Sequence, residues 1–118
     1  MKTKDSSVRT QLHWILTDFL LTRVDPYYRS LGGELIITSG SEVEARHGRT
    51  SLHYAIPGCA VDIRSWKVGE ATAADQAEVI LNLANEYAEE NGLQAGDIEV
   101  ILESTHIHME LQPKRREG

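Results

Sequence analysis

The sequence predicts one small α+β domain over residues 1–118, with an antiparallel sheet and flanking helices. Three observations predict it. The chain of 118 residues is 41% hydrophobic and 25% charged, which is the composition of an ordinary folded domain. Apolar residues recur at helical spacing in two segments and alternate with polar ones in others. No repeat, low-complexity tract or linker divides the chain, so we expect a single core with the order helix, strand, strand, helix, strand, strand.

The first half of the chain begins with an amphipathic pattern. Apolar residues at helical spacing predict a helix from Ser7 to about Arg23, with Ser6 or Ser7 as its N-cap. The pair Asp25-Pro26 is expected to end this helix, because proline disfavours the helical conformation of the residue before it.

Two strands and a long loop are expected next. A turn at Gly32-Gly33 precedes residues 34–39, which read as a strand, and the polar residues 40–50 read as an exposed loop. Residues 59–63 alternate as a half-buried strand should, with the chain's only cysteine, Cys59, on the apolar side. We expect Cys59 to be a core residue, because a single cysteine cannot form an intrachain disulfide.

A second helix and a hairpin complete the domain. Thr72 and Asp75 form a capping box ahead of an apolar stripe that runs to Ala88, and Gly92 stands where a C-terminal cap belongs. Residues 97–103 and 106–112 then predict two strands joined by a tight turn at residues 104–105.

Charge and hydropathy exclude several classes of partner. Eighteen acidic against twelve basic residues give a net charge of -6, which argues against nucleic-acid binding. No segment approaches the ~20 apolar residues of a membrane span, so no membrane insertion is expected. The polar start of the chain has no secretory signal, and we therefore expect synthesis in the cytoplasm.

Several side chains with metal-binding chemistry converge on one expected surface. His106 and His108 alternate with apolar residues and share a face, and the turn places Glu103 on that face too. Asp62 lies on the polar face of its strand, with His53 at the strand entrance. Such a set supplies three N or O ligands and a further carboxylate, as a catalytic zinc site requires. The alternative is a solvated sheet face in which Asp62 pairs with an arginine.

Two motifs resemble those of a known family. Residues 51–63, which include Ser-Leu-His-Tyr and Ala-Val-Asp-Ile, and residues 103–108, Glu-Ser-Thr-His-Ile-His, are similar to the zinc signatures of the D-alanyl-D-alanine metallopeptidases and L-alanyl-D-glutamate endolysins. The signalling domain of hedgehog proteins shares their fold and has closely similar motifs. The resemblance covers residues 36–111, and it implies a hedgehog-like peptidase fold.

The resemblance implies specific roles for the residues of these motifs. Zinc would be held by His53, Asp62 and His108, with Glu103 as the general base. His106 would line the site and donate to the oxyanion or the leaving group. The spacing in the carboxypeptidases instead selects His106 as the third ligand.

Further roles are implied for residues before the first motif's histidine. Ser51 would bind the substrate carboxylate or brace His53, and hedgehog proteins also have a histidine where His47 stands. The enzymes carry an arginine after the Ser-Gly pair that corresponds to residues 39–40, whereas this chain has Ser41-Glu42. Arg46 or Arg49 would take that arginine's role of polarising the scissile carbonyl, unless both are ordinary loop residues.

The function implied by the resemblance is a zinc-dependent peptidoglycan peptidase that hydrolyses an amide bond of the stem peptide. It would be a D,D-carboxypeptidase, or an endopeptidase of the endolysin type that is released when the cell lyses, as in a phage lysis enzyme. The first alternative is a catalytically inactive, hedgehog-like zinc module that binds a peptide or a protein. The second is a metal-free structural domain such as a virion component.

Overall fold

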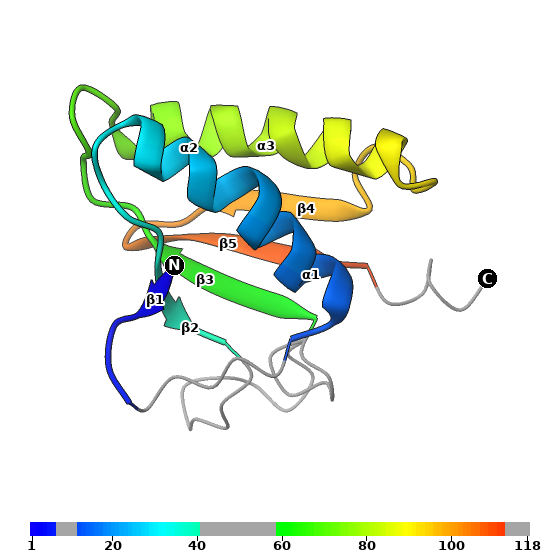
Figure 1. The fold of residues 1–118 in the computed structure, drawn as a ribbon, viewed down its shortest axis with the longest axis horizontal. Coiled ribbons are helices and arrows are strands. Elements are labelled where there is room, and N and C mark those ends of the chain that lie inside the picture. The colour runs from blue at the N-terminus through cyan, green and yellow to red at the C-terminus, as the bar shows by residue number, and fades with distance from the viewer. Residues whose placement is uncertain (7–11, 41–58, 113–118) are drawn as a thin grey trace.

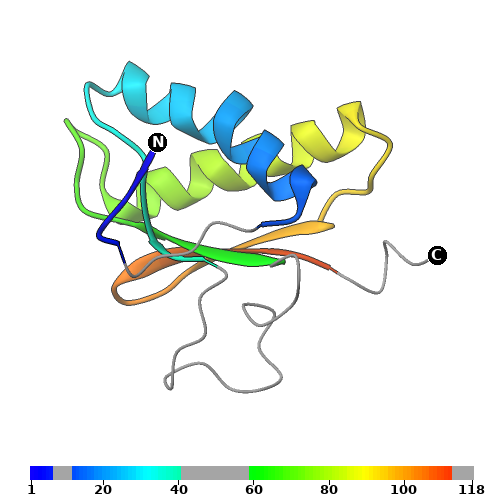
Figure 2. The ribbon, with the colours of Figure 1, turned by 60° about the horizontal axis from the view of Figure 1, so that its bottom comes forward.

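The computed structural model describes residues 1–6, 12–40 and 59–112 and confirms a small α+β domain. Helices lie on one side of a five-stranded sheet (Figures 1 and 2). No helix in the described ranges has the length and apolar character needed to cross a bilayer. The elements in chain order are β1 (Lys2–Thr3), α1 (Trp14–Phe19), the π-helical turn η1 (Leu20–Val24), α2 (Asp25–Ser30), β2 (Ile36–Ser39), β3 (Ala60–Arg64), α3 (Ala73–Glu90), β4 (Ile98–Leu102) and β5 (His106–Leu111).

The sheet has the strand order β1-β2-β3-β5-β4 and is mixed. The pairs β2–β3, β3–β5 and β4–β5 are antiparallel, as predicted, but β1 runs parallel to β2. The expectation of a purely antiparallel sheet is therefore wrong. A strand of two polar residues is too short to show an alternating pattern, and the intervening helices provide the crossover that a parallel pair needs.

The first helical segment differs from the prediction at both described ends. The helix begins at Trp14, after His13, whose ring accepts a hydrogen bond from the Ile15 N–H at 3.2 Å. Ser6 is therefore not its N-cap, and Ser7 lies outside the described residues.

The helical path also continues past Asp25 and Pro26 to Ser30. A proline inside an α-helix removes one backbone hydrogen bond and clashes with the carbonyl four residues before it. Here η1 precedes it: the Asp25 N–H donates to the Leu20 carbonyl in the wider π pattern, and Pro26 falls in the first turn of α2. The expectation that Asp25-Pro26 ends the helix is wrong for this reason.

The second helix and the hairpin confirm the sequence pattern. Thr72 and Asp75 make the reciprocal capping box, and Gly92, with a φ of 76°, follows the C-cap Asn91. The Leu93 N–H donates to the Ala88 carbonyl at 2.7 Å, the bond expected when a left-handed glycine ends a helix. The Glu103 N–H donates to the His106 carbonyl at 2.9 Å, which closes the two-residue turn.

A single core lies between the helices and the sheet. Its members from the sheet include Val61, Ile63, Ile107 and Met109, each 0% exposed, and Cys59 belongs to it as predicted. The strand β3 was expected to be half-buried, but its opposite face is buried too, with Asp62 7% exposed. This strand is the middle one of five, and Asp62 lies between its register partners, Ser39 of β2 and His108 of β5.

Candidate metal centre

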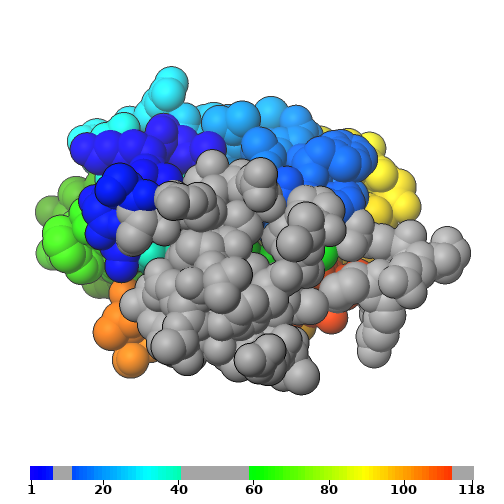
Figure 3. Space-filling view, turned by 90° about the horizontal axis from the view of Figure 1, so that it is seen from below, coloured from blue at the N-terminus to red at the C-terminus, as the bar shows by residue number. Residues whose placement is uncertain are grey.

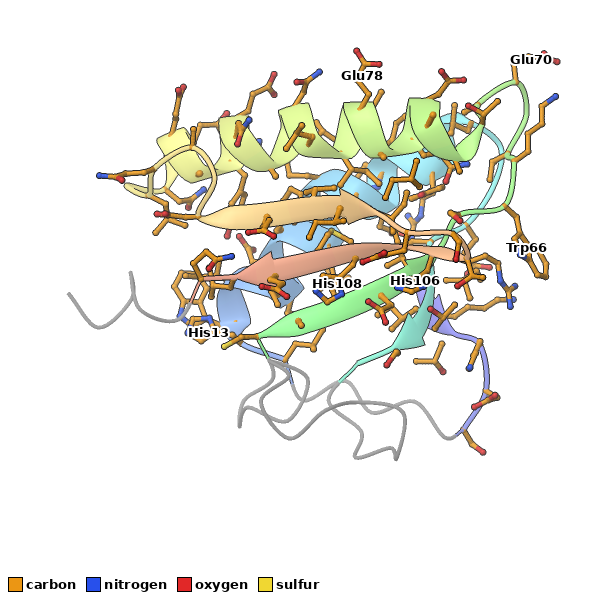
Figure 4. The ribbon with its side chains drawn as sticks, turned by 180° about the vertical axis from the view of Figure 1, so that it is seen from behind. His13, Trp66, Glu70, Glu78, His106 and His108 are labelled. Carbon is orange, nitrogen blue, oxygen red and sulfur yellow. The ribbon has the colours of Figure 1, made fainter. Side chains whose placement is uncertain are left out.

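The pairing of β3 with β5 brings three metal-binding side chains together. Asp62 is the register partner of His108, and Arg64 is the partner of His106. Alternation along each strand directs the core residues to the helices, so these four side chains share the opposite face. Figure 4 shows the two labelled histidines along β5, beside β3.

Asp62, His106 and His108 form the candidate metal centre. Each offers one ligand atom, and the three atoms lie within 4.8 Å of one another. The His108 Nδ1 is 2.6 Å from the Asp62 Oδ1, and the His106 Nε2 is 3.5 Å from the same oxygen. Both rings therefore direct a nitrogen toward one carboxylate oxygen.

Glu110 holds the other nitrogen of His108. Its Oε1 lies 2.7 Å from the His108 Nε2, so the ring is bracketed by two carboxylates. Burial lowers the pKa of His108, but the hydrogen bonds to Asp62 and Glu110 outweigh it and raise the pKa from 6.5 to about 9. Without a metal the ring is an imidazolium that donates to both carboxylates.

Thr105, in the hairpin turn, orients the ring of His106. The Thr105 Oγ1 lies 3.0 Å from its Nδ1, and this contact leaves the Nε2 facing Asp62. The ring is partly exposed, with 28% of its side-chain surface accessible. His106 is therefore the more open of the two histidines.

The donor set fits a zinc ion. Two imidazoles and one carboxylate are ligands that zinc takes in catalytic sites, at about 2.0–2.2 Å from the ion. Tetrahedral ligands at that distance lie roughly 3.3 Å apart, close to the 3.5 Å between His106 and Asp62. The 2.6 Å between His108 and Asp62 is a hydrogen-bond distance, so an ion would replace the proton between them.

A carboxylate behind a ligand histidine is a common feature of zinc sites. It fixes the tautomer and raises the basicity of the imidazole. With its Nε2–H donated to Glu110, His108 presents Nδ1 as its ligand atom. The motifs predict no role for Glu110, although its position two residues after His108 on β5 places it on the same face.

Some of the predicted site residues belong to the described part of the chain, and the others do not. Glu103 is exposed beside the hairpin turn, and its carboxylate is not in the group of described ligand atoms that gather within 4.8 Å. The structure brings both candidates for the third ligand, His106 and His108, to Asp62. The other predicted residues lie outside the described ranges: Arg46, His47, Arg49, Ser51 and His53.

Comparisons of the chain with models of protein families, with curated proteins and with solved structures found no match.

Proposed function

We propose that this chain is a zinc-dependent peptidase that hydrolyses an amide bond in the stem peptide of peptidoglycan. The observation that carries the proposal is the convergence of Asp62, His106 and His108 within 4.8 Å on one sheet face. Buried polar groups on a sheet face cost stability unless they are paired, and a cluster with a strongly shifted pKa is a feature of functional sites.

The ligands in this proposal come from three places in the chain. Asp62 and His108 hold the ion together with His53 of the first motif, and His106 lines the site or replaces one of them. A zinc ion bound there would polarise a substrate carbonyl and make a water molecule acidic near neutral pH.

The chain's own residues have distinct tasks. Glu110 keeps a proton on the Nε2 of His108 and so fixes the ring in the orientation that leaves Nδ1 for the ion. Thr105 holds the ring of His106 from the other side of the site. Glu103 stands next to His106 across the hairpin turn, and in this proposal it accepts the proton of the attacking water.

The test combines metal analysis with digestion. Protein prepared with zinc should contain close to one zinc per chain and should convert purified stem peptides to shorter products detected by mass spectrometry. Asp62→Asn should lose both the metal and the activity. The matched control is Glu99→Gln, which removes a carboxylate of β4 that bonds to Gln112 at 2.9 Å and does not belong to the metal centre. Unchanged stem peptides with a zinc-loaded protein would contradict the proposal.

One observation favours a second candidate, a zinc module that binds a peptide without cleaving it. The carboxylate of Glu103, the predicted base, is not among the described ligand atoms that gather within 4.8 Å of one another. This candidate predicts zinc-dependent binding of peptides that stay intact.

A further inference from the structure

A small pocket lies at the end of the sheet, beside the loop that follows β3. This loop is at the same end of the molecule as the turn of the β4–β5 hairpin (Figures 1 and 3). The volume of the pocket is about 210 Å³. An apolar cavity of about 150 Å³ is large enough to bind benzene, so this pocket has room for one aromatic ring and a small substituent. Its described lining residues are Tyr28, Glu34, Ile36, Arg64, Trp66, Lys67 and Val68.

A buried glutamine of α3 holds two walls of the pocket in place. Gln76, which is 0% exposed, accepts a hydrogen bond from the Tyr28 hydroxyl at 2.7 Å and donates one to the Trp66 carbonyl at 2.8 Å. It therefore joins α2 to the loop that follows β3. Reciprocal backbone bonds between Val68 and Ala71, at 3.0 and 2.9 Å, close this loop. The pocket is thus formed without a ligand, which lowers the entropy cost of binding one.

Arg64 presents the edge of its guanidinium beside this pocket. The guanidinium carbon lies 3.9 Å from the centre of the Trp66 ring, and this stacking restricts the plane of the fork. Figure 4 shows the labelled Trp66 projecting from the loop at the end of the molecule. Within the described ranges, no side chain forms a hydrogen bond or an ion pair with the Arg64 guanidinium. Stacking occupies the face of a guanidinium and leaves its N–H edge available for a planar anion.

The charge of the lining favours an anion. Arg64 and Lys67 have no ion pair with any described carboxylate, whereas the acidic residue of the lining, Glu34, lies 3.4 Å from the Lys2 ammonium. The chain has 18 acidic residues against 12 basic ones, so two neighbouring cations without an acidic partner stand out on it. A carboxylate matches the planar fork of an arginine in two parallel hydrogen bonds.

We propose that this pocket binds a small aromatic carboxylate. The aromatic ring packs against the apolar lining, in which Tyr28 and Trp66 favour a flat ring over a branched aliphatic group. The carboxylate pairs with Arg64, and Lys67 adds a second positive charge. No described residue of the candidate metal centre lines the pocket, so this site is separate from the centre and does not depend on the proposed function.

The test follows the indole N–H signal of Trp66 by NMR during titration with benzoate, with the neutral benzamide and with acetate. The chain has two tryptophans, and Trp14, which is 65% exposed on α1, serves as the internal reference. Benzoate should shift the Trp66 signal saturably at millimolar or lower concentration and leave the Trp14 signal unchanged. Benzamide lacks the charge and acetate lacks the ring, so each should bind at least about 10-fold more weakly.

Substitutions of the two cations test their roles. Arg64→Gln should weaken benzoate binding by about 10-fold and remove the preference over benzamide, and Arg64→Lys, which keeps the charge and loses the fork, should retain part of it. Lys67→Gln should have the smaller effect, because a lysine acts as a point charge. The matched control is Arg29→Gln, which removes an exposed arginine of α2 that pairs with Asp25 and should leave benzoate binding unchanged. The melting temperature of each variant shows whether it is folded.

Carboxylates also bind to zinc, so the titration is made with zinc-loaded protein and again with a chelator present. The affinity for benzoate should be the same in both. Loss of binding on removal of zinc would assign benzoate to the metal centre and overturn the proposal. Equal binding of benzoate and benzamide, no saturable shift of the Trp66 signal, or an Arg64→Gln variant that keeps the preference would overturn it as well. Digestion of stem peptides tests the peptidase separately, so either proposal can fail without the other.

Discussion

The two faces of β3 and β5 are made of alternate residues of the same strands, yet they differ in what holds them. The helix-facing side is apolar, with Ile63, Ile107 and Met109 fully buried. The other side holds Asp62, which is buried, and His108, which is partly buried, and both are polar. Burial of apolar surface stabilises the first face. On the second face, each buried polar atom costs stability unless it has a hydrogen-bond partner. The fold and the site are therefore separable, because each depends on its own set of side chains.

The largest effect is expected at the polar face, on activity alone. If the chain is a peptidase, Glu103→Gln should lower the rate by roughly 10²- to 10⁴-fold, because a general base contributes about that much. Zinc content and melting temperature should change little, since the side chain is exposed beside a turn. Loss of zinc in this variant would make the carboxylate a ligand, and a rate within a few-fold of the original would exclude it as the base.

The helix-facing side should show the opposite response. Ile107→Ala leaves a cavity in the core and should lower the free energy of unfolding by about 2–5 kcal/mol in urea denaturation. The protein that remains folded should still bind close to one zinc per chain. A variant that keeps its stability would show that the core is not packed as described.

The metal-free protein should lose stability as the pH rises. The pKa of His108 is about 9 in the folded chain and near 6.5 when unfolded, so the stabilisation is complete below pH 6.5 and is lost as the pH rises through 9. Among the described residues, Asp62 from β3 and Glu110 from β5 bond to the ring. The loss should be at most on the order of 3 kcal/mol, measured by urea unfolding at pH 6 and pH 9.5 with a chelator present. His108→Gln should remove this dependence, and a variant that retained it would refute the assignment.

The smallest effect is expected from the carboxylate behind His108. Glu110→Gln should weaken zinc binding by about 10- to 100-fold, the usual consequence of losing a carboxylate that supports a ligand histidine. Competition with a coloured chelator measures it, and Glu99→Gln, on the facing position of β4, is the control. Equal losses in the two variants would mean that the effect is one of overall charge.

Local sequence patterns predicted most of the fold correctly. The capping box of α3, the glycine after it and the alternation along β5 depend on neighbours in the sequence, and the structure confirms each of them. The wrong predictions concern features that depend on contacts between residues far apart in the sequence or on an irregular helical turn. The parallel direction of β1 depends on its pairing with β2. The helix continues past Pro26 because of a π turn, which no pattern in the sequence predicted.

The same division applies to the site. Alternation alone placed His106 and His108 on one face, and β3 and β5 lie side by side with Asp62 opposite His108. No role was predicted for Glu110, although alternation along β5 places it on the face of His108. Its bond to the Nε2 of His108 depends on the direction of the side chain, which the spacing of a motif does not encode.

The π turn η1 also has a consequence for the length of the first helical segment. A π turn takes about one residue more than an α turn to complete the same rotation, so deleting one residue from Leu20–Val24 would give an ordinary helix and leave the direction of the residues after it nearly unchanged. Tyr28, whose hydroxyl donates to Gln76 at 2.7 Å, would keep that contact. The same deletion within α1 would rotate the helix after it by about 100°, so a one-residue gap between related chains is expected in η1 rather than in α1.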